Sequence, residues 1–186
     1  MGQLIYLIGA SGSGKDSVIN EVKKQLDADM PVLFAHRYIT RPAEMGGENY
    51  ISLSEQEFTI RQKAELFAMS WNSHGYRYGI GTEINLWMQQ GFFVVVNGSR
   101  EYLPLASSIY PDMMVCLIKV SKEKLQERLL ARGRETNEEI AKRLERADAF
   151  QVQHPNLKVI NNDYSLDKSA DQFFNIIQKQ SIGSIY

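Results

Sequence analysis

The sequence of 186 residues is poor in cysteine and histidine, with only Cys116, His36, His74 and His154. A single cysteine excludes an internal disulfide and is typical of proteins in a reducing cytoplasm. The histidines are not spaced as zinc ligands are, and no Ser-His-Asp arrangement suggests hydrolysis. The composition therefore argues against a disulfide scaffold, a histidine-based metal site and a hydrolase.

The sequence also lacks long apolar runs and an excess of charge of one sign. No apolar stretch approaches the roughly 18 residues that a membrane-spanning helix needs, and no signal-peptide pattern opens the chain. Lys and Arg number 21 against 22 Asp and Glu, for a formal net charge of -1. Because no overall positive field attracts nucleic acid or a membrane surface, we expect a protein that binds neither. The single cysteine and the missing signal-peptide pattern favour the cytoplasm. Any polyanionic ligand must be bound by local clusters of Lys and Arg.

What the sequence does contain is a glycine-rich segment, Gly9–Asp16, that reads GASGSGKD. It matches the phosphate-binding loop G-x-x-x-x-G-K-[ST] except at the last position, which is Asp. An apolar run, Leu4–Ile8, predicts a buried strand before it, and helical periodicity over Ser17–Leu26 predicts a helix after it. The loop N–H groups, the helix dipole and Lys15 would bind nucleotide phosphates. The residues predicted to bind the nucleotide are Gly9, Ala10, Ser11, Gly12, Ser13, Gly14, Lys15, Asp16, Ser17 and Arg128.

Asp16 allows two interpretations. In most phosphate loops the residue after Lys ligates Mg²⁺ through a hydroxyl. Asp16 could bind the ion directly or through water, and Ser17 could supply a hydroxyl instead. Alternatively, the Asp16 carboxylate caps the helix and stabilises its positive N-terminus. Both interpretations stay open, so Asp16 and Ser17 are the candidate Mg²⁺ ligands.

Strands alternate with helices along the chain, which predicts a parallel sheet covered by helices on both faces. The predicted strands are Leu4–Ile8, Phe92–Val96, Met114–Val120, Leu157–Ile160 and, beside the first, Val32–Ala35. The predicted helices are Ser17–Leu26, Leu103–Ile109, Lys122–Ala131, Glu138–Phe150 and Leu166–Gln178. We expect one domain over residues 1–186, with a core formed by residues 1–35 and 83–186.

Two segments interrupt this alternation. Residues from about 36 to 82 contain short runs, Tyr38–Thr40 and Asn49–Ile51, that suggest small antiparallel strands. Ser54-Glu55-Gln56-Glu57 has a capping-box pattern that predicts a helix start. This insertion is interpreted as the acceptor-binding part, or else as a plain surface subdomain. The second segment, about 132–142, contains Gly133, a natural helix stop, and a second capping box beginning at Thr136; it predicts a short lid.

Arginines gather around the second segment. Arg128 and Arg132 lie four residues apart and hence on one face of a helix. Arg134 follows the Gly133 turn, and Arg143 lies four residues after Glu139, which could brace it. Phosphoryl transfer needs alignment and positive charge over the equatorial oxygens, which arginine and Mg²⁺ supply. These arginines are therefore candidates for that role, and the alternative is that they are solvated helix-face charges.

The chain resembles the guanylate-kinase branch of the nucleoside-monophosphate kinases over nearly its whole length. The segments that carry the resemblance are Gly9–Asp16, Thr40–Pro42, Gly47–Tyr50, Gly75–Gly79, Arg132–Arg134 and Lys142–Leu144. In that family an Arg and two Tyr hold the phosphate of the acceptor, and the resemblance places Arg41, Tyr50 and Tyr78 in those roles. An arginine fork with two phenol donors is also a plausible anion clamp on chemical grounds.

The departures from that family concern base recognition. The resemblance places Glu44 where the family has a second phosphate-binding Arg, and Met69 and Ile80 where a glutamate and a serine read guanine. Recognition of guanine needs acceptors for its N1–H and its amine, and Met and Ile have none. We therefore expect an acceptor other than GMP.

A smaller family of guanylate-kinase relatives, the ribose 1,5-bisphosphate phosphokinases, is similar to the chain at further segments. These segments are Gly12–Ser17, Ala35–Arg41, Leu53–Phe58 and Val96–Arg100, and they include the unusual Lys-Asp pair. The resemblance implies ATP-dependent phosphorylation of ribose 1,5-bisphosphate to 5-phosphoribosyl 1-diphosphate in bacterial phosphonate degradation. Arg37, Arg77 and Arg100, placed where guanine-reading groups would cluster, are expected to hold the second phosphate of the acceptor.

The sequence thus predicts a three-layer α/β phosphate-loop kinase with a parallel core sheet, an acceptor-binding insertion and a short arginine-bearing lid. ATP is the expected phosphate donor, Mg²⁺ the expected ion, and Lys15, Arg132 and Arg143 the expected catalytic residues. Two alternatives remain: a guanylate kinase or another small-molecule phosphate kinase, and a non-catalytic guanylate-kinase-like binding module. The intact segment Gly9–Lys15 disfavours the module, because such modules typically lose the phosphate loop.

Overall fold

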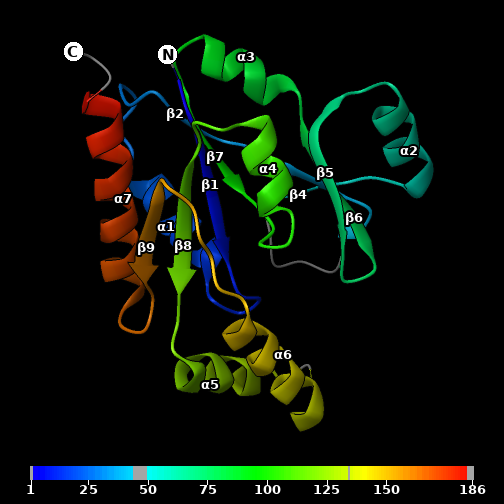
Figure 1. The fold of residues 1–186 in the computed structure, drawn as a ribbon, viewed down its shortest axis with the longest axis vertical. Coiled ribbons are helices and arrows are strands. Elements are labelled where there is room, and N and C mark those ends of the chain that lie inside the picture. Colours follow the sequence, from blue (N-terminus) through cyan, green and yellow to red (C-terminus); the bar gives the residue numbers. More distant parts are fainter. Residues whose placement is uncertain (1, 44–49, 134, 184–186) are drawn as a thin grey trace. The chain divides into compact units, whose positions relative to one another are not determined.

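The computed structural model describes residues 2–43, 50–133 and 135–183. Glu44, Gly47–Asn49 and Arg134, which the sequence analysis singled out, lie outside the described residues. The chain forms two compact units, one of Met1–Tyr6 with Pro31–Met113 and one of Leu7–Met30 with Met114–Tyr186. Strand β1 (Leu4–Gly9), blue in Figure 1, is buried along its whole length. Its residues are divided between the two units.

A five-stranded sheet has the order β2-β7-β1-β8-β9, with β2 (Val32–Phe34), β7 (Phe93–Asn97), β8 (Met114–Lys119) and β9 (Leu157–Asn161). The apolar runs therefore predicted each strand of this sheet, and the α/β class is confirmed. The expectation that Val32–Ala35 lies beside the first strand is wrong, because β2 pairs in parallel with β7 instead. An apolar run predicts that a strand is buried, but it does not predict which strand lies beside it. The strand that pairs with β2 is about 60 residues away in the sequence.

The first unit also contains a four-stranded sheet of order β4-β3-β6-β5. Its strands are β3 (Arg37–Ile39), β4 (Tyr50–Ser52), β5 (Phe67–Ser73) and β6 (Tyr76–Gly81). Strands β5 and β6 form a hairpin whose two loop residues, His74 and Gly75, both have positive φ, of 51° and 79°. Positive φ at both loop residues is typical of a type I′ turn, whose backbone twist matches the right-handed twist of the two strands. The two strands that the short runs predicted, β3 and β4, are parallel rather than antiparallel, because alternation predicts a strand without its direction. Strands β5 and β6 were not predicted, and the pairs β3/β6 and β5/β6 are antiparallel.

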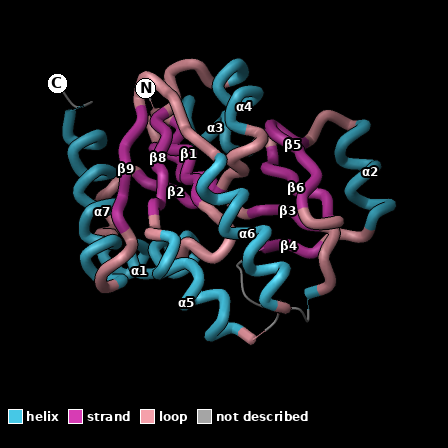
Figure 2. Tube along the Cα trace, turned by 60° about the horizontal axis from the view of Figure 1, so that its bottom comes forward, coloured by secondary structure: helices cyan, strands magenta, loops and turns pink. Residues whose placement is uncertain are grey.

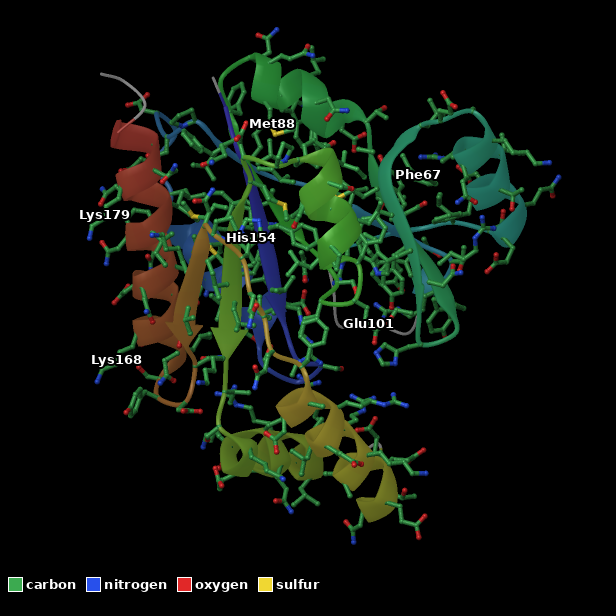
Figure 3. All side chains as sticks on the ribbon, viewed as in Figure 1. Phe67, Met88, Glu101, His154, Lys168 and Lys179 are labelled. Atoms are coloured by element: carbon green, nitrogen blue, oxygen red, sulfur yellow. The ribbon has the colours of Figure 1, made fainter. Side chains whose placement is uncertain are left out.

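Helix α2 (Glu55–Lys63) covers one face of this second sheet (Figure 2). Its only buried residue, Phe58, packs against Phe67 of β5, with ring centroids 4.6 Å apart; Phe67 is marked in Figure 3. Ser54 accepts the N–H of Glu57 at 3.0 Å, as the capping pattern predicts. The Glu57 carboxylate bonds to Arg61 rather than reaching back, so within the described residues only half of that capping box forms. The unit also contains α3 (Glu83–Gln89), which the sequence reading missed, and α4 (Leu103–Ile109).

The second unit contains α1 (Lys15–Gln25) and the long helix α7 (Leu166–Gly183), which runs alongside β9 in Figure 1. Helix α1 buries an apolar stripe of Val18, Ile19 and Val22. Gln25 of α1 donates to Asp171 of α7 at 3.0 Å. Across the part of the chain that the structure describes, no helix is both long and apolar enough to cross a bilayer.

The second unit also contains a helical pair, α5 (Lys122–Arg132) and α6 (Asn137–Ala149). The two helices share a small core of Leu125, Leu129, Ile140 and Leu144. Gly133 ends α5 in the left-handed conformation (φ 59°), and Thr136 starts α6 with a complete capping box to Glu139. Both local predictions are confirmed, because a C-terminal glycine and a capping box depend only on neighbouring residues.

Candidate active site

The glycine-rich loop connects the end of β1 to the start of α1. Gly12 and Gly14 adopt φ of 93° and 90°, a region that only glycine enters easily. Their backbones are also tightly packed: a Cβ on Gly12 would lie 3.1 Å from Leu125 and from Leu129 of α5. Because α1 begins directly at Lys15, its first N–H groups have no acceptor within the helix and are available to an anion.

Lys15 is the first residue of α1. Its Nζ donates to the carbonyl oxygens of Gly9, at 3.0 Å, and Ala10, at 3.4 Å. The ammonium group therefore lies over the start of the loop, on a side chain with four rotatable carbons. In this position it can supply a positive charge to a phosphate that the loop amides bind.

Asp16 lies in the first turn of α1, half-buried, and Ser17 beside it is exposed. The N-cap residue of α1 is Gly14, without a side-chain capping bond, so Asp16 does not act as the N-cap. A carboxylate in a first turn still interacts favourably with the helix dipole. One carboxylate and one hydroxyl are suitable ligands for Mg²⁺, which is usually held by few protein groups together with substrate phosphates. Within residues 2–43, 50–133 and 135–183, no group of three or more His, Cys, Asp or Glu side chains is placed to hold a metal ion.

The arginines of the helical pair reach the loop in two ways. Arg128 donates to the carbonyl oxygens of Ser13, at 3.2 Å, and Asn162, at 2.7 Å. Arg143 of α6 donates to Ser11 Oγ at 3.0 Å. Arg132 is exposed on the last turn of α5. The structure thus brings Arg128 and Arg143 to the loop, and not Arg132.

Arg143 has a different acidic neighbour from the one expected. Its guanidinium forms an ion pair with Glu135. Glu139, four residues before it, is occupied by the capping box, where its carboxylate accepts the backbone N–H of Thr136 at 2.8 Å. That hydrogen bond, with the Thr136 hydroxyl, lowers the pKa of Glu139. The four-residue spacing was correct for a helix contact, but the helix start competed for the same carboxylate.

In the first unit, one face of the four-stranded sheet carries a row of aromatic side chains with an arginine among them. Strand register places Arg37 opposite Tyr50, and Tyr78 opposite Trp71. Arg37 is only 9% exposed, with its guanidinium carbon 5.9 Å from the centre of the Tyr78 ring. The Tyr78 ring stacks on Trp71 with centroids 5.6 Å apart and an interplanar angle of 6°. Because paired residues of neighbouring strands share a face, the four side chains form one surface, named here the Arg–Tyr face.

Arg41 joins this surface from the segment after β3. Its guanidinium carbon lies 4.4 Å from the centre of the Tyr50 ring, well within the range of a cation–π contact. The Tyr50 hydroxyl donates to the Pro42 carbonyl at 2.6 Å, and Ser52 Oγ donates to the Arg41 carbonyl at 2.6 Å. The structure therefore brings together Arg37, Arg41, Tyr50 and Tyr78.

Met69 and Ile80 form the apolar part of the same face. They are paired directly across β5 and β6, and both are buried. Ile80 lies two residues after Tyr78, and Met69 two before Trp71, so all four point to one side. Neither Met69 nor Ile80 offers a hydrogen-bond acceptor of the kind that a guanine edge needs.

Arg77 lies on the opposite face of β6, one residue before Tyr78. Its guanidinium donates to Thr59 Oγ1 at 2.7 Å, bonds to Gln62 and lies 4.3 Å from the centre of the Phe58 ring. All three partners belong to α2. The structure therefore uses Arg77 to attach α2 to the hairpin, and it does not bring Arg77 to the Arg–Tyr face.

Arg100 follows β7 in a turn that is fixed by a buried tyrosine. The Tyr6 hydroxyl donates to the Ser99 carbonyl at 3.1 Å and accepts the Ser99 N–H at 3.0 Å, and burial raises its pKa. Gly98 lies against the Tyr6 ring, where a Cβ would approach to 2.1 Å. Arg100 itself is half-buried, and desolvation lowers the pKa of its guanidinium while Glu101 opposes that shift.

Two contacts of the site were not predicted from the sequence. Trp71 supports the Tyr78 ring and also contacts Tyr102, with centroids 5.5 Å apart. Asn162 is buried beside the phosphate loop and donates to the Ser13 carbonyl at 2.6 Å. Residue spacing gives no signal for either, because both contacts join segments far apart in the sequence.

A glycine-rich loop between a buried parallel strand and a helix that begins with lysine defines a phosphate-loop nucleotide-binding protein. The guanylate kinase family model matches residues 1–180. A ribose 1,5-bisphosphate phosphokinase PhnN from Thiobacillus denitrificans is 51% identical over 95% of this chain and 93% of its own length. Another, from Desulfomicrobium baculatum, is 49% identical over 98% and 97%. The crystal structure of a guanylate kinase from Anaplasma phagocytophilum has a TM-score of 0.71 at 16% identity, covering 97% of this chain and 86% of that one.

The chain belongs to the guanylate kinase family. The structural likeness confirms the phosphate-loop kinase fold. Membership of this family of phosphotransferases also implies ATP as the phosphate donor.

Proposed function

We propose that the protein transfers the γ-phosphate of ATP to the 1-phosphate of ribose 1,5-bisphosphate, giving 5-phosphoribosyl 1-diphosphate and ADP. The observation that carries the choice of acceptor is the Arg–Tyr face, where Met69 and Ile80 are apolar and buried beside the cations. Such a face can hold phosphates but cannot read a guanine base. Relatives about 50% identical over nearly the whole chain bear the name of this activity.

In the mechanism that we propose, one set of residues binds ATP, the phosphate donor, and another set binds the sugar phosphate that accepts the phosphoryl group. The loop amides and Lys15 bind the β- and γ-phosphates of ATP. Arg143 and Arg132 neutralise the transferring group, with closure of the helical pair as a lid excluding water and limiting ATP hydrolysis. Arg128 holds the loop. Asp16 and Ser17 would hold Mg²⁺, which supplies positive charge to the phosphates when bound.

On the acceptor side, Arg41, Tyr50 and Tyr78 bind the attacking phosphate by charge-assisted hydrogen bonds. Arg37 and Arg100 bind the 5-phosphate. The transfer is direct and in line between two phosphate oxygens, so no side chain has to form a covalent intermediate. The pathway we propose for the product is phosphonate degradation, and the compartment is the cytoplasm.

The test is an acceptor screen with purified protein, Mg²⁺ and ATP, following ADP release. We expect turnover with ribose 1,5-bisphosphate and little with GMP. Turnover with GMP at equal or higher kcat/KM would instead favour a guanylate kinase. ADP release with neither acceptor, combined with measurable ATP binding, would favour the non-catalytic module.

A further inference from the structure

We propose that Asn162 is a positioning residue for the phosphate loop. Its side-chain amide holds the Ser13 carbonyl in the direction in which the N–H of Gly14 faces the bound phosphates. The inference deepens the proposed function and rests on it, because it assumes that the loop binds ATP. Asn162 touches no phosphate in this proposal. It acts through one peptide group of the loop.

The Ser13 carbonyl oxygen is held by two donors from distant parts of the chain. Asn162 Nδ2 donates to it at 2.6 Å, and an Arg128 nitrogen donates at 3.2 Å. Asn162 is 3% exposed, so water competes little for its amide. The second guanidinium nitrogen of Arg128 donates to the Asn162 carbonyl at 2.7 Å, which joins the two donors into one brace.

This brace sets the direction of the next N–H because the peptide group is planar. No cis peptide bond occurs in the part of the chain that the structure describes, so the C=O of Ser13 and the N–H of Gly14 point in opposite directions. Gly14 is the N-cap of α1. Its N–H therefore lies next to the first N–H groups of that helix, which have no intrahelical acceptor. When the Ser13 carbonyl is held pointing away from the anion site, the Gly14 N–H is held pointing toward it and adds one donor to that site.

Asn162 is itself fixed in the orientation that this role needs. Ser169 Oγ, fully buried, is placed to donate to Asn162 Oδ1 at 2.8 Å, with the carbonyl oxygens of Asn161 and Ser165 as its other acceptors, at 2.9 Å and 3.3 Å. The Asn162 backbone N–H donates to the Lys119 carbonyl at 2.8 Å. A carbonyl oxygen can only accept, so the amide nitrogen must face Ser13, and a flipped amide would place two acceptors together. The side chain also lies against Gly14, where a Cβ would approach Asn162 Nδ2 to 2.6 Å.

The experiment compares Mg·ADP affinity, by calorimetry, in the wild type, Asn162→Ala and Ser169→Ala. We expect Asn162→Ala to weaken ADP binding about tenfold, since a lost hydrogen bond and a misaligned charge-assisted donor together cost about 1–2 kcal/mol. Ser169→Ala keeps the amide but frees its orientation, so a smaller loss in the same direction is expected. The KM for the acceptor should not change in either variant.

Gln172→Ala is the matched control. Gln172 is an exposed amide of α7 that accepts the N–H of Asn161 at 3.1 Å and donates to Val159 at 3.0 Å, without reaching the loop. General loosening of this region would lower the ADP affinity of the control and of Asn162→Ala alike, and that result overturns the proposal. ADP affinity within about twofold of wild type in folded Asn162→Ala, a loss well below 1 kcal/mol, also overturns it.

NMR spectroscopy measures the Ser13–Gly14 peptide group directly. The amide resonance of Gly14 should shift on ADP addition in the wild type and shift less in Ser169→Ala. If Asn162→Ala does not fold, an unchanged Gly14 shift and unchanged ADP affinity in Ser169→Ala overturn the proposal. Failure of the wild type to bind ADP would instead refute the proposed function, so the two failures are distinguishable.

Discussion

The phosphate loop and the Arg–Tyr face are both suited to phosphate, but they are constructed differently. The loop presents backbone N–H groups, and its side chains mostly hold the backbone in place: Arg128 and Asn162 bond to the Ser13 carbonyl, and two glycines take positive φ. The Arg–Tyr face presents side chains, supported by other side chains through stacking and strand register. A site formed by backbone N–H groups depends on a few glycines and on the side chains that hold them, whereas a site formed by side chains can change its ligand by substitution.

That difference bears on the acceptor that we propose. Few residue types tolerate the conformation of the loop glycines. On the Arg–Tyr face, Met69 and Ile80 are paired across regular strands and offer no acceptor to a guanine base, so a change of side chain there can change the ligand without changing the strands. Apolar residues also suit a buried position on paired strands.

The largest effect is expected at Lys15, the positively charged side chain of the phosphate loop. Lys15→Ala should lower kcat about 10³-fold, because it removes a preorganised charge from the transferring phosphate. Steady-state kinetics with ribose 1,5-bisphosphate measure this, and the melting temperature should stay near the wild-type value. Full activity in Lys15→Ala would sink the mechanism.

A loss confined to one substrate is expected on the Arg–Tyr face. Arg41→Ala should raise the KM for the acceptor about 10–100-fold, since hydrogen bonds to charged groups contribute about 1.5–3 kcal/mol. The KM for ATP should be unchanged. An equal rise in both KM values would contradict the separation of donor and acceptor groups.

Substitution of Arg77 tests whether the α2-covered face of the four-stranded sheet contributes to acceptor binding. Arg77→Ala should lower the free energy of unfolding by about 1–3 kcal/mol, because it removes hydrogen bonds and a cation–π contact to α2. Chemical denaturation measures the loss, and the acceptor KM should be unchanged.

Arg61→Ala is the control for that prediction. Arg61 forms a partly exposed ion pair with Glu57 on the same helix and lies 5.0 Å from the centre of the Tyr38 ring. Exposed contacts of these two kinds contribute about 0–1 kcal/mol each, so a smaller loss of stability than in Arg77→Ala is expected. A raised acceptor KM in Arg77→Ala at unchanged stability would instead support the phosphate-binding role that the sequence suggested.

The smallest effect is expected at the start of α6. Thr136→Ala should cost about 1 kcal/mol of stability by removing the N-cap of a complete capping box. Ser54→Ala, at the half-formed box of α2, should cost less. Thermal unfolding of the two variants measures the difference, and an equal or larger loss in Ser54→Ala would show that the second half of the box adds nothing.

Features that depend on near neighbours were predictable from the sequence. The phosphate loop, the Gly133 helix stop and the Thr136 capping box each involve residues within one or two turns, and the structure contains all three. Apolar periodicity likewise predicted the strands of the five-stranded sheet and five helices to within a few residues, because it reports burial of a local face. The short helix α3 was missed, since it has neither a strong cap nor a long periodic pattern.

Only the tertiary structure decided which distant residues meet. The partner of β2, the parallel pairing of β3 with β4 and the opposite faces of Arg77 and Tyr78 all follow from strand register. The same is true of Asn162 at the Ser13 carbonyl, 149 residues away in sequence. Such contacts are set by the packing of whole elements, which no local pattern records. The sequence by itself therefore determined the phosphate loop, and the tertiary structure decided which distant side chains lie beside that loop and on the Arg–Tyr face.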